Sequence, residues 1–278
     1  MKTALHCTNS SRRNCRTSDL PRQSRRTSTV GYHTQDWMNN EAYYMMGGQF
    51  ENTTGEALKL SEIGFDFYNT PDLIPEKDTG NLYQKTCPQL QIANATTTST
   101  LTYYYVKQTN KSTGAVRFGW TPGSGMQDPT IDAGIGFWYR NPLSDKPSYT
   151  FSGQVLPDSP WEKNFASVAH YMLVNPFPKA WDVCKEADVV IAGLQESAPE
   201  KDAANEYQKT AAQIQVPASA TSSAFTPYYY VKQTNKSTGA VRYGWTPGSG
   251  MATTLPVPVG RACWFRPPVA NTKVTFFE

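Results

Sequence analysis

The chain has 278 residues, of which 38% are hydrophobic and 13% aromatic, and its formal net charge is +3. No stretch approaches the roughly 18 consecutive apolar residues of a membrane helix, and the first five residues are too short for the apolar core of a signal peptide. We therefore expect a soluble globular fold without a transmembrane segment, and the N-terminus gives no support for secretion.

The chain begins with a basic segment. Residues 1–30 contain seven Lys or Arg and one Asp, together with many Ser and Thr. This composition cannot bury enough apolar surface to fold, so we expect residues 1–36 to form a disordered basic tail. Basic residues can neutralise the phosphates of nucleic acid, but the tail lacks interleaved aromatic residues and precedes no recognisable nucleic-acid-binding fold. Nucleic acid is therefore not an expected partner.

A segment of 24 residues occurs twice in the rest of the chain. Residues 103–126 and 228–251 differ only where Phe118 is replaced by Tyr243, and weaker matches flank both copies at nearly the same offset. Each copy of an internal repeat must form the same supersecondary unit. The sequence therefore predicts two homologous units, at residues 37–156 and 157–278.

Short strands with Gly/Pro turns dominate the predicted elements of both units. In chain order, we predict strands at residues 43–46, 89–92, 103–106, 116–120, 134–140, 149–155, 170–174 and 213–216. The strands at 103–106 and 116–120 should pair as a hairpin, with Gly114 at a positive φ in the turn. Weak helical periodicity occurs at 56–63 and 161–169. The predicted fold is all-β and mainly antiparallel, with two β-sandwich-like units.

The five cysteines do not form a recognisable pattern. Cys7 and Cys15 lie in the basic tail, and Cys87, Cys184 and Cys263 have no cysteine at the equivalent position of the other unit. There is no C-x-x-C motif and no Cys/His set at zinc-finger spacing. We expect no disulfide framework, no metal site and no cofactor.

Catalytic motifs are also missing from the sequence. It has no G-x-S-x-G, no H-E-x-x-H and no Walker lysine, and its paired glycines lack the third glycine of a dinucleotide loop. Asp128 and Asp132 could form a carboxylate pair, but the second unit has no acid there, and the other acids considered, Glu56, Glu62, Glu186 and Asp188, are expected on a solvated face. The sequence thus predicts no catalytic residue, although two carboxylates brought together only by folding would escape this search.

Aromatic residues give the one positive indication of ligand binding. In the strand predicted at 134–140, alternation turns Trp138 and Arg140 away from the core, and the second unit repeats the pair as Trp264 and Arg266. An exposed Trp beside an Arg can stack on a sugar ring or on a partner's side chain. Two alternatives are that Trp138 lies in a core between two layers, or that the arginine stem packs over it.

Three motifs resemble those of uncharacterised bacterial tandem-repeat β proteins, which are usually secreted. The motifs are a G-N-P-F-P-like turn, a Y-Y-Y strand and a G-x-G-F-W strand, found here as Val174-Asn175-Pro176-Phe177-Pro178, Tyr103-Tyr104-Tyr105 and Gly134-Ile135-Gly136-Phe137-Trp138. This resemblance implies that the motifs form turns and pack the core, and that the protein is located outside the cell. It implies no activity and no catalytic residue.

Together these observations predict a non-enzymatic surface or extracellular repeat protein with a structural or adhesive role. Its expected partners are glycans or other envelope proteins, and its expected location is the cell surface or the extracellular space. The alternative is a bivalent pair of carbohydrate-binding modules that use exposed aromatic residues. The third reading is an unrecognised hydrolase.

Overall fold

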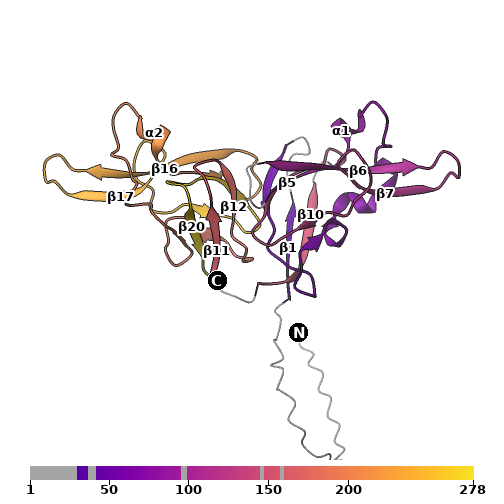
Figure 1. Cartoon of the computed structure of the whole chain (residues 1–278), viewed down its shortest axis with the longest axis horizontal. Helices are drawn as coiled ribbons and strands as arrows, with labels where there is room; N and C mark the ends of the chain where they lie inside the picture. Colours follow the sequence, from indigo (N-terminus) through magenta and orange to yellow (C-terminus); the bar gives the residue numbers. More distant parts are fainter. Residues whose placement is uncertain (1–29, 37–41, 95–98, 145–146, 157–159) are drawn as a thin grey trace, which may run out of the picture.

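A computed structural model describes residues 30–36, 42–94, 99–144, 147–156 and 160–278. This part of the chain folds into antiparallel β-sheets with two one-turn α-helices, which confirms the predicted all-β class (Figure 1). None of the helices in the described ranges is long and apolar enough to cross a membrane. The folded chain has two halves that lie side by side.

The first half contains ten strands and four short helical turns. Its helical turns are α1 (Tyr83–Thr86) and 3-10 helices at Leu60–Glu62, Asp66–Asn69 and Pro71–Leu73. Its strands are β1 (Val30–Asp36), β2 (Tyr44–Gly47), β3 (Leu58–Lys59), β4 (Gly64–Phe65), β5 (Gln89–Ala93), β6 (Thr100–Thr109), β7 (Val116–Thr121), β8 (Thr130–Ile131), β9 (Gly136–Arg140) and β10 (Ser148–Gln154).

The second half repeats this series of strands around the single helical turn α2 (Tyr207–Thr210). Its strands are β11 (Trp161–Phe165), β12 (Tyr171–Val174), β13 (Trp181–Asp182), β14 (Val189–Ile191), β15 (Gln213–Pro217), β16 (Phe225–Thr234), β17 (Val241–Thr246), β18 (Pro256–Val257), β19 (Ala262–Arg266) and β20 (Thr272–Phe276).

Both halves have the same sheet topology. Each contains a five-stranded sheet, in the order β2-β9-β5-β6-β7 or β12-β19-β15-β16-β17, and a three-stranded sheet, in the order β1-β10-β4 or β11-β20-β14. A two-stranded ribbon, β3-β8 or β13-β18, completes each half. The equal strand orders fit the internal repeat, and the common origin of the two units stays a prediction.

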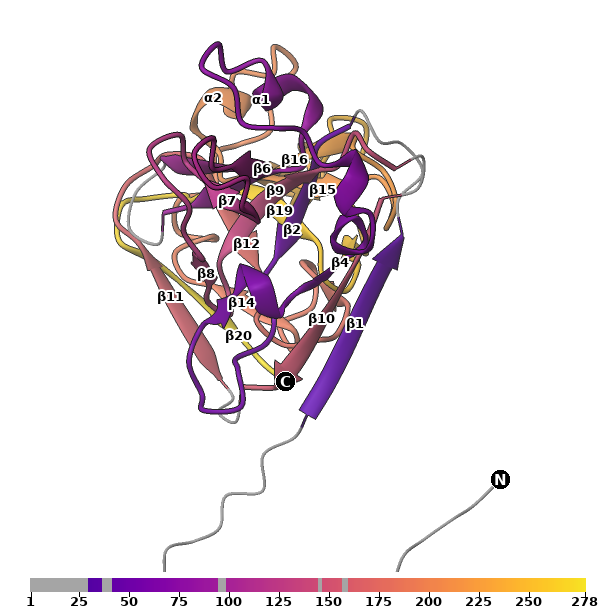
Figure 2. The ribbon, with the colours of Figure 1, turned by 90° about the vertical axis from the view of Figure 1, so that its right-hand side faces the viewer.

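The hydrophobic core of each half lies between its five-stranded and three-stranded sheets (Figure 2). Phe137 of β9 meets Phe151 of β10 with ring centroids 5.9 Å apart, and Phe165 of β11 meets Phe265 of β19 at 5.3 Å. Aromatic rings at these distances fill a sandwich core and gain edge-to-face contacts. The aromatic-rich composition thus builds the interior of both halves.

A long hairpin extends from each five-stranded sheet, and the two hairpins point to opposite ends of the molecule (Figure 1). Strand β6 pairs with β7 from Tyr104–Thr121 to Thr109–Val116, and β16 pairs with β17 in the same register. The turns use Gly114 at φ 71° and Gly239 at φ 70°, a conformation that glycine adopts without steric cost. The predicted hairpin and its turn are confirmed.

The structure corrects three boundaries. Val30–Asp36, which we assigned to the disordered tail, forms strand β1 and pairs with β10, while residues 1–29 lie outside the described ranges. The possible helix at 161–169 is wrong, because Trp161–Phe165 pairs with β20 as strand β11. The possible helix at 56–63 is instead a strand followed by a 3-10 turn. Sheet pairing outweighs weak helical periodicity at both places.

The two halves meet through an apolar contact that we call the central interface. It is formed by the outer faces of β2 and β9 in the first half and β12 and β19 in the second. Its members are the buried Met45, Met172, Val174 and Ala262, surrounded by Ala93, Trp138, Phe225 and Trp264. In each half, the edge strand of the five-stranded sheet and its neighbour are therefore covered on both faces.

Two glycines allow the sheets to come this close. A Cβ on Gly47 would lie 2.2 Å from Cγ1 of Val174, and a Cβ on Gly136 would lie 2.5 Å from Cβ of Met172. The main chains also touch, because the amide of Gly47 donates to the carbonyl oxygen of Gly260 at 2.9 Å. The central interface thus has the close packing of a protein interior.

Arg261 adds a polar connection at one edge of the central interface. Its side chain is 1% exposed. The guanidinium donates to the carbonyl oxygen of Met45 in the first half at 3.0 Å. In the second half it donates to the carbonyl oxygens of Ser219, Ala220 and Ser222 at distances between 2.6 and 3.1 Å. Burial lowers the pKa of Arg261 to about 10, so the side chain stays charged at neutral pH.

The first prediction concerns the close approach at Gly47. The substitution Gly47→Ala should lower the free energy of unfolding by about 1–3 kcal/mol, because the added methyl group overlaps Val174. The matched control is Gly125→Ala, where nothing lies within 4 Å of the added atom. Urea denaturation of both variants measures the difference. Equal stability of the two variants would show that the sheets are not in close contact.

The second prediction concerns Arg261. Arg261→Met should cost about 2–4 kcal/mol of stability, because four carbonyl oxygens lose a donor while the interface stays closed to water. Arg242→Met is the control, since this exposed arginine bonds only to Gln233 among the contacts described, and it should cost less than about 0.5 kcal/mol. Similar costs for both arginines in chemical denaturation would contradict the assignment.

Candidate functional site

The predicted aromatic residues Trp138 and Trp264 lie together in the central interface. Their ring centroids are 6.1 Å apart, and the ring of Phe225 lies 5.9 Å from Trp138. Both tryptophans are half-buried and point away from the core of their own half, as strand alternation predicts. The layer that covers each ring is the other half of the chain, and their role in ligand binding stays a prediction.

The predicted arginines, Arg140 and Arg266, attach the one-turn helices to the sheets. Arg140 donates to the carbonyl oxygen of Lys85, within α1, at 3.1 Å. Arg266 donates to the carbonyl oxygens of Gln208 and Ala211, at 2.7 and 2.6 Å, around α2. The Arg140 guanidinium also lies 5.6 Å from the ring centroid of Tyr43. Each arginine thus binds main-chain carbonyl groups of its own half.

A pocket lies at the base of each hairpin, where the hairpin leaves the body of the molecule. The first-half pocket has a volume of about 490 Å³ and is lined by residues that include Tyr68, Tyr105, Phe118, Trp120, Gln127 and Asp128. The second-half pocket has a volume of about 420 Å³ and is lined by residues that include Glu186, Gln195, Glu196, Tyr230, Tyr243 and Trp245. The repeated segment supplies the equivalent tyrosine, glycine and tryptophan to both.

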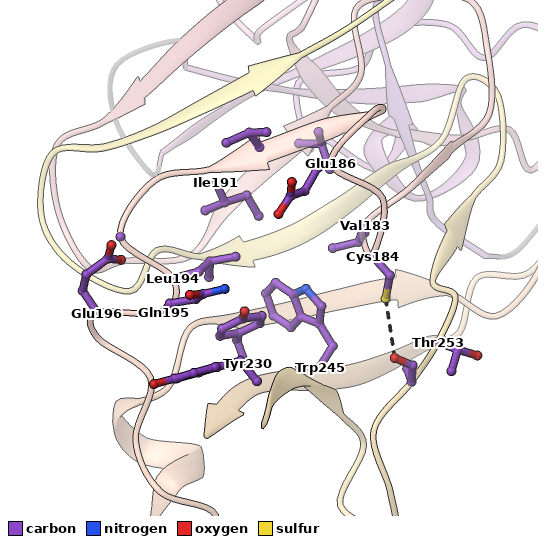
Figure 3. A pocket seen from close by; sticks show the side chains of 16 residues that line it. Val183, Cys184, Glu186, Ile191, Leu194, Gln195, Glu196, Tyr230, Trp245 and Thr253 are labelled. Atoms are coloured by element: carbon purple, nitrogen blue, oxygen red, sulfur yellow. Dashed lines mark hydrogen bonds between the residues drawn. The ribbon is translucent and has the colours of Figure 1, made fainter. Parts of the chain in front are cut away.

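The second-half pocket has an aromatic wall and an acidic rim (Figure 3). Tyr230 and Trp245 contact each other edge to face, with ring centroids 5.3 Å apart and an interplanar angle of 73°. The carboxylates of Glu186 and Glu196 belong to the loops before and after β14. Burial raises the pKa of Tyr230, and the nearby carboxylates of Glu186 and Glu196 add to this shift.

The first-half pocket has the same aromatic corner and a fixed hydrogen-bond chain behind it. Tyr105 and Trp120 meet at 5.3 Å with an interplanar angle of 63°. Nε1 of Trp120 donates to the hydroxyl oxygen of Tyr68 at 2.9 Å, and that hydroxyl donates to the carbonyl oxygen of Leu60 at 2.8 Å. Burial raises the pKa of Tyr68, so its hydroxyl is protonated at neutral pH and acts as a donor.

Asp128 provides the carboxylate of the first-half pocket. It accepts hydrogen bonds from the amide and the hydroxyl group of Ser61, at 3.0 and 2.6 Å. In the sequence, Asp128 was a candidate only as half of a carboxylate pair with Asp132. Among the described residues, no group of three or more His, Cys, Asp or Glu could hold a metal ion.

The repeated segment contains a pattern that could have predicted the pockets, although Trp138 and Trp264 were the only tryptophans assigned to ligand binding. Alternation along residues 116–120 places Phe118 and Trp120 on the same side of the strand, and this side lines the pocket. The one difference between the two repeated segments, Phe118 against Tyr243, also lies at the pocket wall. The acidic residues have no such signal, because they come from separate loops.

Neither a protein-family model nor a curated protein nor a solved structure matches this chain. Two pockets of similar size repeat the same aromatic corner, and each adds at least one carboxylate. Such a pocket can bind a small group through ring faces, with charge determining which group is preferred.

The third prediction uses Cys184, a free thiol that lines the second-half pocket. Burial and the neighbouring Asp182 raise its pKa to about 11, and its thiol donates to the carbonyl oxygen of Ala252 at 3.8 Å. Since the thiolate is the reactive form, alkylation at pH 8 should be on the order of 100-fold slower than for an ordinary cysteine. Its rate should still rise between pH 9 and pH 10.

Alkylation of the native chain, followed by mass spectrometry of the peptide that contains Cys184, measures this rate without interference from the other cysteines. The same peptide in the denatured chain is the control, and its rate should level off above about pH 9. A native rate that also levels off there would show that the thiol is not buried against the pocket wall.

Proposed function

We propose that this protein is a non-enzymatic, adhesive surface protein that binds its target through both hairpin pockets at once. The observation that supports this proposal is the occurrence of the same aromatic pocket in each half, at the base of hairpins that point to opposite ends (Figure 1). The central interface keeps the two pockets at a fixed separation, because the halves are packed together rather than joined only by a linker.

A fixed pair of weak sites suits a surface that presents many copies of one ligand. Once the first pocket is occupied, the second meets its ligand at a high effective concentration, so avidity exceeds the affinity of either site. A ligand that is free in solution gains nothing from this arrangement. The proposed partners are therefore glycans or other envelope proteins, and the proposed location is the cell surface or the extracellular space.

A bivalent pair of carbohydrate-binding modules is the second candidate. It is supported by aromatic rings that keep part of their surface exposed, since Phe118 and Tyr243 are each 39% exposed beside the pockets. Ring faces of this kind stack on sugar rings. Trp138 and Trp264, in the central interface, also stay candidates for stacking on sugar rings. An unrecognised hydrolase is the third reading, and its signature would be a chemical change in the bound ligand.

The fourth prediction tests bivalency on surfaces. The chain is applied to chips that carry oligosaccharides, alkylammonium groups or neutral alkyl groups at a low and a high density. At high density, Tyr243→Ala should reduce retention about three- to tenfold, because the bivalent affinity depends on the product of the affinities of both pockets. At low density, where each pocket binds separately, the unchanged pocket should limit the loss to about twofold. Phe118→Ala should act in the same way from the other pocket, and both residues are exposed enough to replace without unfolding.

The same chips also distinguish the three candidate functions. Trp138→Ala combined with Trp264→Ala tests the residues of the central interface, with the folding of the variant checked by circular dichroism. Mass spectrometry of the eluted ligand detects hydrolysis. Retention that does not depend on ligand density, or that survives the loss of both Phe118 and Tyr243, would contradict bivalent binding through the pockets.

A further inference from the structure

The described residues that line the two pockets share one electrostatic property. Both sets contain carboxylates, Glu186 and Glu196 in the second half and Asp128 in the first, and neither contains a Lys, Arg or His. An anionic ligand would therefore meet uncompensated negative charge in both pockets. A neutral ligand would gain nothing from these carboxylates beyond hydrogen bonds, whereas a cation would be attracted by all of them.

The aromatic rings of each pocket are arranged as a corner. The interplanar angle is 73° between Tyr230 and Trp245 and 63° between Tyr105 and Trp120, with the same 5.3 Å between centroids. Tyr243 and Phe118 border the open side of these corners. Trp245 and Trp120 are buried in these corners, whereas Tyr243 and Phe118 offer exposed ring surface, and the negative potential over ring faces attracts a cation.

The carboxylates act close to these rings. In the second half, Glu186 and Glu196 are both near enough to Tyr230 to disfavour ionisation of its hydroxyl (Figure 3). In the first half, Asp128 has the same effect on Tyr68 and is held in place by Ser61. Aromatic rings and carboxylates that line the same pocket are the elements by which proteins recognise alkylammonium groups. Cavities of about 420 and 490 Å³ have room for such a group.

We propose that each hairpin pocket binds the positively charged alkylammonium group of its ligand, and that the second-half pocket, with two carboxylates, binds it more tightly than the first-half pocket, with one. This inference rests on the proposed function, because it names the chemical class of ligand for the same pair of pockets. Quaternary ammonium head groups and lysine side chains share this chemistry.

The fifth prediction compares a cation with a neutral molecule of the same shape. Choline and its neutral isostere dimethylbutanol are titrated into the full chain, and binding is followed by NMR and calorimetry. Choline should bind at least about tenfold more tightly than the isostere, because only the charged form gains the cation–π and carboxylate interactions. Its affinity should fall as salt is added, since the carboxylates are exposed.

Variants identify the pocket that binds. Glu186→Gln combined with Glu196→Gln should weaken choline binding to the second-half pocket about two- to fivefold and leave the isostere unchanged. Tyr243→Ala should weaken choline binding about three- to tenfold, whereas Tyr243→Phe, which installs the residue of the first-half pocket, should retain most of it. Glu206→Gln, at an exposed residue paired with Lys209 near α2, is the matched control and should change nothing.

Three outcomes would overturn the assignment of ligand class. They are no saturable choline binding up to about 10 mM, equal binding of choline and its isostere, or identical choline binding by the double glutamine variant. If an oligosaccharide is instead retained on the chip in a manner that depends on Tyr243 and Phe118, bivalent binding stands and the cationic ligand is wrong. Nα-acetyl-lysine amide, which has a primary ammonium group, and its form trimethylated at Nζ distinguish a lysine side chain from a quaternary head group as the ligand.

Discussion

Close packing of two β-sheets around Gly47 and Gly136 is the constraint on which the rest of the structure depends. At both glycines, the space that a side chain would occupy is filled by Val174 or Met172 of the other half. This contact covers the outer faces of β2 and β9 and explains why residues there, such as Met45, are apolar although they point away from the core of their own half. The chain is thus two similar sandwiches whose five-stranded sheets pack against each other, rather than two modules on a linker.

The pockets lie where the core of each sandwich ends. The hairpin of β6 and β7 extends from this core into solvent, so Trp120 is buried at its base while Phe118, two residues closer to the tip, is 39% exposed. The second half repeats this with Trp245 and Tyr243. A pocket forms on each side because an aromatic strand passes from interior to solvent beside the loops of its own half. Similar pockets at opposite ends of one packed body are the basis for the proposed bivalent binding.

The sequence predicted most of the strands because their signals are local. Alternating polar and apolar residues predicted β5 and β15, and the glycine in each turn predicted the hairpins. The repeated segment indicated that the second half would have the same strands as the first. It misassigned β1, since Val30–Asp36 is held by pairing with β10 far along the chain and not by its own composition. Long-range pairing also determines β11, where local periodicity favoured a helix.

The candidate site was less predictable for the same reason. Alternation correctly turned Trp138 outward, but it cannot indicate what covers an outward residue, and here the cover is Trp264 of the other half. The acidic residues of the second-half pocket reach Tyr230 only through folding, because they precede it by a long stretch of chain. No spacing rule connects them with the hairpin. The repeated segment itself was the better guide, because it supplies the aromatic corner of both pockets.

The distance between the two hairpin turns tests the central claim most directly. Spin labels introduced as unnatural amino acids at Ser112 and Ser237, both exposed in the turns, report this distance in the full chain by pulsed electron resonance. A closely packed central interface predicts a single narrow distance distribution that does not change with salt concentration. A broad distribution, as expected for two domains on a flexible linker, would contradict the packed central interface and the fixed separation of the two pockets.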